Sequence, residues 1–242
     1  MVHILSYNIY CPPMITNKEH VSKVCNYIKG VVSQNKDVPI IALTEVFQSW
    51  VRDQILKELS TLSGKWKVTP IVHEGTINVS SGLMVLWDTE KILRSGKMHT
   101  VEYKRCFQLD CFSNKGAVHV PFTVIKNSVP INLIVTHMQA WAPECMNSIR
   151  SSQFDQLGTL VKSIPNKKNI IIVGDFNENP NMEFSKKYDL QMPVGNPFLN
   201  TYENFFFDHA YANCKIEIEK VCHDENPSDH SPVLININNV VN

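Results

Sequence analysis

The sequence has no long hydrophobic run, and no stretch approaches the roughly 18 apolar residues that a membrane-spanning helix needs. It also lacks the basic region and apolar core of a signal peptide, because Met1 is followed directly by a strand-like segment. If the 242 residues are a whole gene product, a cytoplasmic location is the expectation. If a leader was removed, a secreted protein fits the sequence equally well.

Charge of one sign is not in excess either, because 23 lysines and arginines balance 23 aspartates and glutamates. Proteins that bind nucleic-acid phosphates usually carry a surplus of basic residues. The balance therefore argues against a nonspecific nuclease, although it leaves room for a local basic groove.

No Cys-x-x-Cys pair occurs among the seven cysteines, so a structural zinc site held by cysteines is not expected. Cys25 stands in a helical pattern and is expected to be a small, buried apolar residue. Cys106, Cys111 and Cys145 fall in polar, loop-like sequence, where one disulfide can form in an oxidising compartment.

Heptads, internal repeats, low-complexity blocks and long linkers are also missing, which favours a single domain over residues 1–242. At 43% hydrophobic residues, the chain can bury a large core. Strand-like apolar runs cover residues 3–8, 39–44, 66–72, 82–87, 116–125, 131–136, 169–173, 207–212 and 233–237. Helical spacing of apolar residues covers 19–32, 48–62 and 147–164. Strands dominate, which indicates two packed sheets with helices outside rather than a regular βαβ barrel.

Polar residues stand at the ends of several of these predicted strands: Asn8, Glu45, His137, Asp175 with Asn177, and Asp229 with His230. Each has an ordinary explanation when taken alone, because a strand end is often just solvated and many histidines merely cap a strand. Their joint occurrence at strand ends is not expected by chance. The set predicts one site assembled from the edges of sheets.

Asp175 and Asn177 follow a fully apolar run, Ile170-Ile-Ile-Val, and a glycine. If the strand continued, its period of two would place both side chains on one face. A carboxylate beside an amide oxygen suits a hard cation, a phosphate or a water nucleophile. An Asp/Asn turn after a strand is the alternative, and this segment alone does not separate the two.

His230 is the sharpest candidate, because the ordinary pKa of histidine lies near neutrality and lets it take a proton from water. A neutral imidazole needs an orienting carboxylate, and Asp208 is the best candidate by pattern. Asp229 is adjacent in sequence, so in a strand its side chain would point to the opposite face. It is better placed to support a metal or the backbone of the site.

These motifs resemble those of the endonuclease/exonuclease/phosphatase superfamily, and the match spans nearly the whole chain. The motifs are Ser-Tyr-Asn8, Thr-Glu45-Val, Gly-Asp175-Phe-Asn177 and Ser-Asp229-His230-Ser-Pro. The resemblance implies an α/β four-layer sandwich of the DNase I-like type, with two packed mixed β-sheets flanked by helices. It also implies metal-dependent phosphoester hydrolysis without fixing the substrate.

Three further segments resemble the neutral sphingomyelinase branch of that superfamily. They are Asn8-Ile-Tyr-Cys-Pro-Pro, Asp110-Cys-Phe-Ser-Asn114-Lys115-Gly116-Ala-Val, and Val135-Thr-His137-Met-Gln139-Ala140 with Arg150 and Gln153 downstream. Met138 replaces the usual leucine, which is a mild change. As in the secreted bacterial enzymes of this branch, the resemblance implies that Cys145 pairs with Cys106 or Cys111.

The chain also departs from the family pattern. Phe206-Phe207-Asp208-His209 stands where the family usually has Arg-x-Asp-Tyr, which weakens the assignment of Asp208. The long aromatic hairpin by which secreted bacterial enzymes engage membranes is not evident. Residues 205–207, three phenylalanines in a row, are expected to form a buried strand rather than a lipid contact.

The resemblance and the residue chemistry lead to one scheme. Glu45 and Asn8 are expected to hold Mg²⁺, or Mn²⁺ or Co²⁺ in its place, with Asp229 supporting the metal. His230, oriented by Asp208, is the expected general base. The roles of the other candidates are as follows: Asp175 and Asn177 position water or a second ion, His137 contacts a phosphoryl oxygen or the leaving group, and Lys115 contacts substrate.

The implied substrate is the phospholipid sphingomyelin, bound at a membrane surface and cleaved to ceramide and phosphocholine. A DNA or RNA endonuclease of the same superfamily would share these residues but should add a basic groove and stacking aromatics. An inositol-phosphate phosphatase would need lysines and arginines clustered around Asp175, which the sequence does not show. A non-catalytic binding module on the same fold is the remaining alternative.

Overall fold

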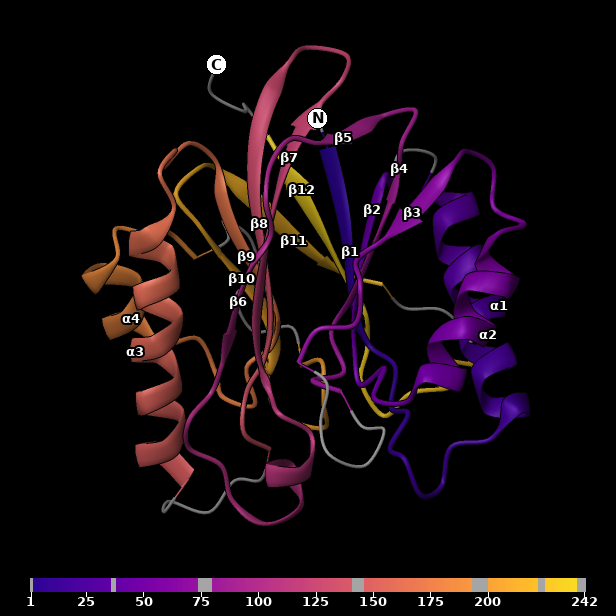
Figure 1. Ribbon diagram of the computed structural model, residues 1–242, viewed down its shortest axis with the longest axis horizontal. Coiled ribbons are helices and arrows are strands. Elements are labelled where there is room, and N and C mark those ends of the chain that lie inside the picture. Colours follow the sequence, from indigo (N-terminus) through magenta and orange to yellow (C-terminus); the bar gives the residue numbers. More distant parts are fainter. Residues whose placement is uncertain are drawn as a thin grey trace.

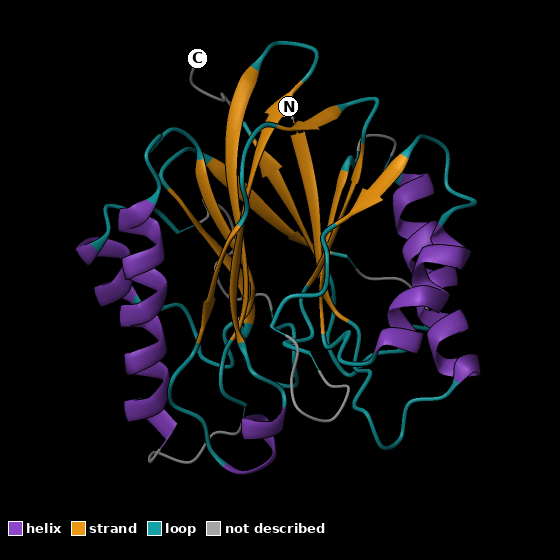
Figure 2. Ribbon diagram, in the orientation of Figure 1, coloured by secondary structure: helices purple, strands orange, loops and turns teal. Residues whose placement is uncertain are grey.

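The computed structural model describes residues 2–35, 38–73, 80–140, 146–192, 200–221 and 225–238. Two six-stranded sheets lie face to face, and helices cover the outer side of each (Figures 1 and 2). This arrangement confirms the predicted fold class. Among the described residues, no helix combines the length and apolar character that crossing a membrane requires.

The first sheet has the strand order β11-β12-β1-β2-β4-β3. Its strands are β1 (Val2–Asn8), β2 (Ile40–Thr44), β3 (Trp66–Val68), β4 (Met84–Asp88), β11 (Ile216–Lys220) and β12 (Val233–Ile237). β1 and β2 are parallel, whereas the other neighbours are antiparallel. The sheet is therefore mixed, as predicted.

The second sheet has the order β10-β9-β8-β7-β5, with β6 pairing to β7. Its strands are β5 (Ile92–Arg94), β6 (His99–Glu102), β7 (Gly116–Val124), β8 (Val129–His137), β9 (Ile170–Asp175) and β10 (Asp208–Ala212). Here β8 and β9 form the parallel pair. Valine, isoleucine and leucine side chains from both sheets interdigitate in the core between them.

Helices α1 (Lys18–Gln34) and α2 (Ser49–Leu59) pack on the first sheet, and α3 (Asn147–Ser163) and α4 (Met182–Lys187) pack on the second. α1 begins where the Asn17 side chain accepts a hydrogen bond from the backbone N–H of His20 at 2.9 Å. Its apolar stripe, which includes the fully buried Cys25, faces the sheet. The expectation that Cys25 is a buried apolar residue is confirmed.

The parallel pairs decide where the site lies. β1 and β2 end at Asn8 and Thr44, and β8 and β9 end at His137 and Asp175, which are direct neighbours in register. The carboxyl ends of all four strands meet at the lower end of the molecule in Figure 1. Residues from distant parts of the sequence are thereby brought to one edge of the two sheets.

Several predicted elements need correction. The strand predicted over 66–72 ends at Val68, and Pro70, which has no N–H to donate to a ladder, follows two residues later. The expected buried strand over the three phenylalanines is wrong, because β10 begins only at Asp208 and Phe205 is 38% exposed. Phe205 instead closes a tight turn, in which its backbone N–H donates to the carbonyl oxygen of Tyr202 at 2.8 Å.

The predicted disulfide is also different. Cys106 and Cys111 pair with each other, not with Cys145, which lies outside the described residues. The 3₁₀ helix η1 (Gln108–Phe112) turns the chain back on itself and brings the two Cα atoms to 5.1 Å. A pairing over five positions is therefore possible without a partner from another segment.

Candidate active site

Asp175 is the fully buried last residue of β9 and lies at the centre of the site. Gly174 before it has a φ of 138°, and a Cβ at this position would lie 2.0 Å from the Thr136 carbonyl oxygen. Only glycine permits this close approach of β9 to β8. The approach places Asp175 beside His137, the last residue of β8.

The carboxylates of Glu45 and Asp175 share a hydrogen-bond donor. The side-chain N–H₂ of Asn8 donates to Glu45 at 3.2 Å and to Asp175 at 2.9 Å. Burial raises the pKa of Glu45 to about 7 and the pKa of Asp175 to about 6. Glu45 also has a φ of 66°, a strained conformation for a non-glycine residue. Two acids therefore face one small space that disfavours their negative charges.

His137 is held from the opposite side by Lys115. The Lys115 Nζ lies 3.0 Å from His137 Nε2, 3.0 Å from the Met138 carbonyl oxygen and 2.9 Å from an Asp110 carboxylate oxygen. His137 Nε2 is in turn 3.5 Å from Asp175 Oδ2. Burial lowers the pKa of His137 well below its ordinary value, and the Lys115 ammonium lowers it further. The ring is therefore neutral at physiological pH.

His230 pairs with Asp208, as the sequence pattern predicted despite its departure from the family motif. His230 Nδ1 lies 2.6 Å from Asp208 Oδ2, and Nε2 lies 3.9 Å from Asp175 Oδ2. Burial opposes a charge on this ring, but the Asp208 and Asp175 carboxylates outweigh it and raise the pKa of His230 to about 10. A carboxylate thus orients the imidazole, while its other nitrogen faces Asp175.

Asn177 lies differently from the strand-based expectation, whereas Asp229 points away from His230 as expected. β9 ends at Asp175, and Asn177 has a φ of 50° with its N–H donating to Asp175 Oδ1 at 2.8 Å. The shared face therefore comes from an Asx turn and not from strand alternation. Asp229 is exposed while its neighbour His230 is buried, so the two point to different sides.

Two groups of side chains in the described part of the chain have the spacing of metal ligands. Glu45, His137 and Asp175 form one, and Asp175, Asp208 and His230 form the other, with ligand atoms within 4.8 Å of one another in each. Asp175 belongs to both, whereas Asp229 belongs to neither. Buried carboxylates with raised pKa values are what a divalent cation would stabilise, so the donor set fits a hard metal ion.

No family model matches the chain. Sphingomyelinase C of Bacillus cereus is 28% identical over 196 residues, which cover 74% of this chain and 55% of that protein. Sphingomyelinase C 1 of Leptospira interrogans is 27% identical over 181 residues, which cover 70% of this chain and 28% of that protein. The chain is therefore similar in sequence to bacterial sphingomyelinase C proteins, in agreement with the resemblance that its motifs indicated.

The chain spans about half the length of the B. cereus relative and less of the Leptospira one. The crystal structure of a Staphylococcus aureus beta toxin mutant with bound magnesium ions superimposes with a TM-score of 0.75 at 17% sequence identity. The superposition covers 98% of this chain and 99% of that chain, which shows that the two share a fold.

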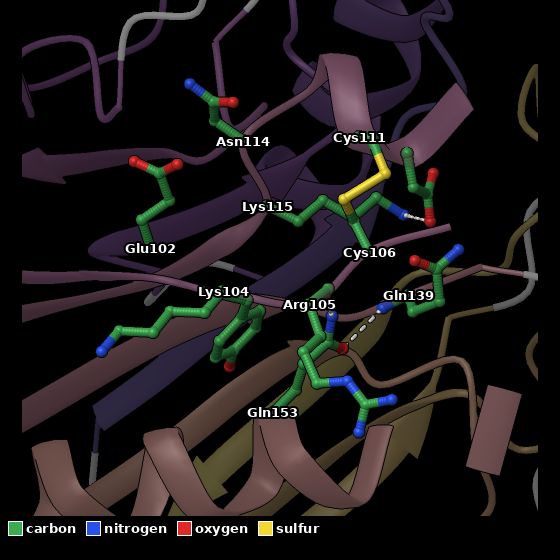
Figure 3. A pocket seen from close by; sticks show the side chains of 11 residues that line it. Glu102, Lys104, Arg105, Cys106, Cys111, Asn114, Lys115, Gln139 and Gln153 are labelled. Atoms are coloured by element: carbon green, nitrogen blue, oxygen red, sulfur yellow. Dashed lines mark hydrogen bonds and ion pairs between the residues drawn. A yellow bond between two sulfur atoms is a disulfide. The ribbon is translucent and has the colours of Figure 1, made fainter. Parts of the chain in front are cut away.

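The sphingomyelinase-like motifs outside the two metal-ligand groups hold the loop that carries the disulfide. The Gln139 side chain accepts a hydrogen bond from the Phe107 N–H at 2.8 Å and donates to the Phe107 carbonyl oxygen at 3.3 Å. Gln153 accepts from the Gln139 N–H and donates to the Arg105 carbonyl oxygen, both at 2.9 Å. Figure 3 shows these side chains around the Cys106–Cys111 disulfide and Lys115. They fix the loop whose Asp110 holds Lys115.

Sequence reasoning missed two residues that support His230. The Ser228 hydroxyl donates to the Asn8 carbonyl oxygen at 2.7 Å and accepts from the His230 N–H at 3.1 Å. The Thr201 hydroxyl accepts from the N–H groups of Phe207 and Asp208 at 3.1 and 2.9 Å. Ser228 stands inside the Ser-Asp-His-Ser-Pro motif and could have been inferred. Thr201 follows no pattern that marks it.

Proposed function

We propose that the chain is a divalent-metal-dependent phosphodiesterase that hydrolyses sphingomyelin to ceramide and phosphocholine. One observation carries the hydrolytic part of this proposal: the buried Asp175 carboxylate joins a candidate metal group to a carboxylate-oriented histidine. Metal-assisted phosphoester hydrolysis needs these two parts within reach of one phosphorus atom. The relatives named sphingomyelinase C support the choice of lipid.

Mg²⁺ is the proposed cofactor, with Glu45 and Asp175 as its carboxylate ligands and Asn8 as an additional polar contact. Bound magnesium in the structurally similar beta toxin supports this choice. When bound, the ion would neutralise a phosphoryl oxygen and the departing alkoxide, and its charge would lower the pKa of His230. Two features make these residues suitable for Mg²⁺: they offer oxygen ligands, and burial raises the pKa values of Glu45 and Asp175, so that a bound cation would stabilise their ionised forms.

The remaining steps belong to the protein. His230, held by Asp208 at Nδ1, takes a proton at Nε2 from the water that attacks phosphorus in line with the leaving group. Asp175 and Asn177 orient that water, and the neutral His137 contacts a phosphoryl oxygen. Lys115 fixes the His137 ring and adds positive charge near the phosphate. Asp229 stands at the exposed rim of the site.

Rival substrates are less compatible with the charges around the site. Among the main electrostatic partners of Glu45 and Asp175, Lys115 is the one permanently charged cation. An inositol phosphate with several phosphate groups would need more positive charge than this lysine supplies. The balanced net charge likewise gives a nucleic-acid backbone no general attraction.

The test is a panel of three substrates, each with Mg²⁺ and with excess EDTA: sphingomyelin in mixed micelles, plasmid DNA and a phosphoinositide. We expect Mg²⁺-dependent release of phosphocholine from sphingomyelin and much slower turnover of the other two. A Glu45→Gln variant should need a higher Mg²⁺ concentration for half-maximal rate. Hydrolysis that is undiminished in EDTA would overturn the metal-dependent scheme, and a preference for DNA would overturn the lipid.

A further inference from the structure

Three aromatic side chains form a stack beside His230. The ring centroids of Tyr202 and Phe207 are 5.7 Å apart with planes 14° from parallel, and those of Phe205 and Phe207 are 4.9 Å apart at 11°. The Tyr202 ring lies 4.7 Å from the His230 ring. We call Tyr202, Phe205 and Phe207 the aromatic stack. It continues directly from the proposed general base to the surface.

The aromatic stack is not part of the hydrophobic core. Phe205 is 38% exposed, and Tyr202 and Phe207 are partly exposed, whereas Phe206 between them is buried. Exposed aromatic faces that pack on one another and on a site histidine mark a surface for a ligand. The stack is an aromatic feature that the proposed hydrolytic steps leave without a role.

The backbone ties the aromatic stack to the site. The N–H of Ser231 donates to the Thr201 carbonyl oxygen at 2.7 Å, next to His230. The Thr201 hydroxyl also accepts from the N–H groups of Phe207 and Asp208. The rings and the His230–Asp208 pair therefore belong to one hydrogen-bonded unit, which presents a preformed surface.

The charge beside the aromatic stack is negative. Burial raises the pKa of the Tyr202 phenol, and the Asp229 and Glu203 carboxylates raise it further. Asp229 and Glu203 are both exposed. Aromatic faces next to carboxylates attract a cation, and a quaternary ammonium suits them best because it has no N–H groups to satisfy. The same carboxylates repel phosphate groups. A nucleobase stacked on these rings would therefore bring the phosphates of its nucleic acid close to negative charges, which is unfavourable.

We propose that the aromatic stack is the subsite for a quaternary ammonium group on the substrate headgroup, with Asp229 and Glu203 supplying the opposite charge. The inference rests on the proposed phosphodiesterase function and adds the residues that choose the headgroup. A choline-sized linker of two carbons would join an ammonium on Tyr202 to a phosphorus atom at His230 and Asp175. This also gives the exposed Asp229 a role away from the metal.

The test uses two water-soluble esters with the same leaving group, p-nitrophenyl phosphorylcholine and methyl p-nitrophenyl phosphate, at saturating Mg²⁺. Both release p-nitrophenol when water attacks phosphorus, and only the first carries a trimethylammonium group. We expect the wild-type protein to have the higher kcat/KM on the choline ester. Tyr202→Leu and Phe205→Leu should each reduce this preference about tenfold, mainly through KM, while the rate on the methyl ester changes little.

Two matched variants sharpen the experiment. Tyr202→Phe keeps the aromatic face without the hydroxyl and should retain the choline preference. Tyr188→Leu removes a ring that follows α4 and packs on Phe184, away from His230, and should leave both esters unaffected. Circular dichroism of each variant checks that it is folded, and Phe205→Leu provides an independent exposed position if Tyr202→Leu is unstable.

The possible failures are distinguishable. A wild-type protein that hydrolyses both esters equally would overturn the headgroup subsite while leaving the phosphodiesterase proposal standing. Variants that slow both esters alike would show that the rings only support His230, which also overturns the subsite. Loss confined to sphingomyelin vesicles would assign the rings to a lipid surface, and loss confined to plasmid DNA would assign them to base stacking. No hydrolysis of either ester by wild type would overturn both proposals.

Discussion

At the scale of single residues, the site is organised around charges that are unfavourable in the absence of a cation. Glu45 and Asp175 are carboxylic acids whose pKa values burial raises to about 7 and about 6, so ionising both near neutral pH is costly. The Asn8 side-chain amide donates a hydrogen bond to each carboxylate, but it is neutral and does not offset their negative charges. A bound divalent cation would remove this cost, which explains why residues of this kind occur together in a buried place.

The buried His209 is expected to make the free energy of unfolding depend on pH. Burial lowers the pKa of His209 to about 4, and the ring is stacked on Phe176 with centroids 4.2 Å apart. A histidine with a depressed folded-state pKa stabilises the protein above its unfolded pKa of about 6.5, and this contribution is lost as the pH falls towards 4. We expect His209 to account for about 3 kcal/mol of destabilisation between these two values.

The measurement is urea unfolding of wild type and His209→Phe at pH 7, 5.5 and 4.5. The phenylalanine keeps a ring against Phe176 but cannot bind a proton, so its free energy of unfolding should fall less steeply with decreasing pH. Other titrating groups, including Asp175, affect both proteins alike and cancel in the difference. Parallel curves would show that His209 does not titrate in this range.

Gly174 provides a second prediction at this scale. Its φ of 138° and the 2.0 Å distance from a Cβ to the Thr136 carbonyl oxygen leave no room for a side chain. Gly174→Ala should lower the free energy of unfolding by roughly 3 kcal/mol and displace Asp175. Gly30→Ala is the matched control, because a Cβ there meets nothing within 4 Å in α1. The control should be stabilised by about 0.5–1 kcal/mol; equal effects at both positions would contradict the account.

At the scale of elements, the disulfide loop supports the site through several contacts. Asp110 accepts a hydrogen bond from the Ala140 N–H at 2.6 Å and pairs with Lys115, whose ammonium contacts His137. Arg150 on α3 adds an ion pair to Glu178 at 3.2 Å and a hydrogen bond to the Gln139 carbonyl oxygen. The loop between β6 and β7, together with the residues that follow β8 and with Arg150 on α3, is therefore a scaffold for His137.

Because the loop is closed by a disulfide, we expect the free energy of unfolding to depend on whether the protein is oxidised or reduced. Replacing both cysteines of the Cys106–Cys111 disulfide with serine should lower the free energy of unfolding by about 2 kcal/mol, because the unfolded chain regains the freedom that the closed loop removes. Wild type treated with a reducing agent should show the same loss, measured by urea unfolding. The double serine variant should not respond to the reductant. If wild type does not respond either, the disulfide does not contribute to stability.

The sequence predicted the long elements better than the short ones. α1, α3, β7, β8 and β12 have enough apolar residues at one spacing to show their type. β5 has three residues and β6 is mostly exposed, so neither carries an apolar pattern. β11 does alternate apolar and polar residues and was overlooked. The turn at residues 202–205 was missed because three phenylalanines suggested a strand, whereas backbone hydrogen bonds close a turn there.

At the scale of the whole molecule, two parallel strand pairs bring Asn8, Glu45, His137 and Asp175 together. The antiparallel pairing of β12 with β1 adds His230, more than 200 positions away from Asn8 in the sequence. The position of polar residues after apolar runs was enough to predict this assembly. It was not enough to predict the partners of Lys115 or the aromatic stack, because both depend on how loops pack across the site. The site residues come from several strands and from the loops between them. A single sequence motif can therefore indicate the type of reaction, but it does not identify the substrate.

The most direct test of this account is the turnover of sphingomyelin by His230→Ala at saturating Mg²⁺, with phosphocholine release as the readout. We predict a loss of at least about 100-fold in kcat, the range that a general base supplies. The fold should remain intact by circular dichroism. His99→Ala, an exposed histidine on β6, is the control and should retain wild-type turnover. A His230→Ala variant that retains more than about a tenth of wild-type activity would contradict the central claim.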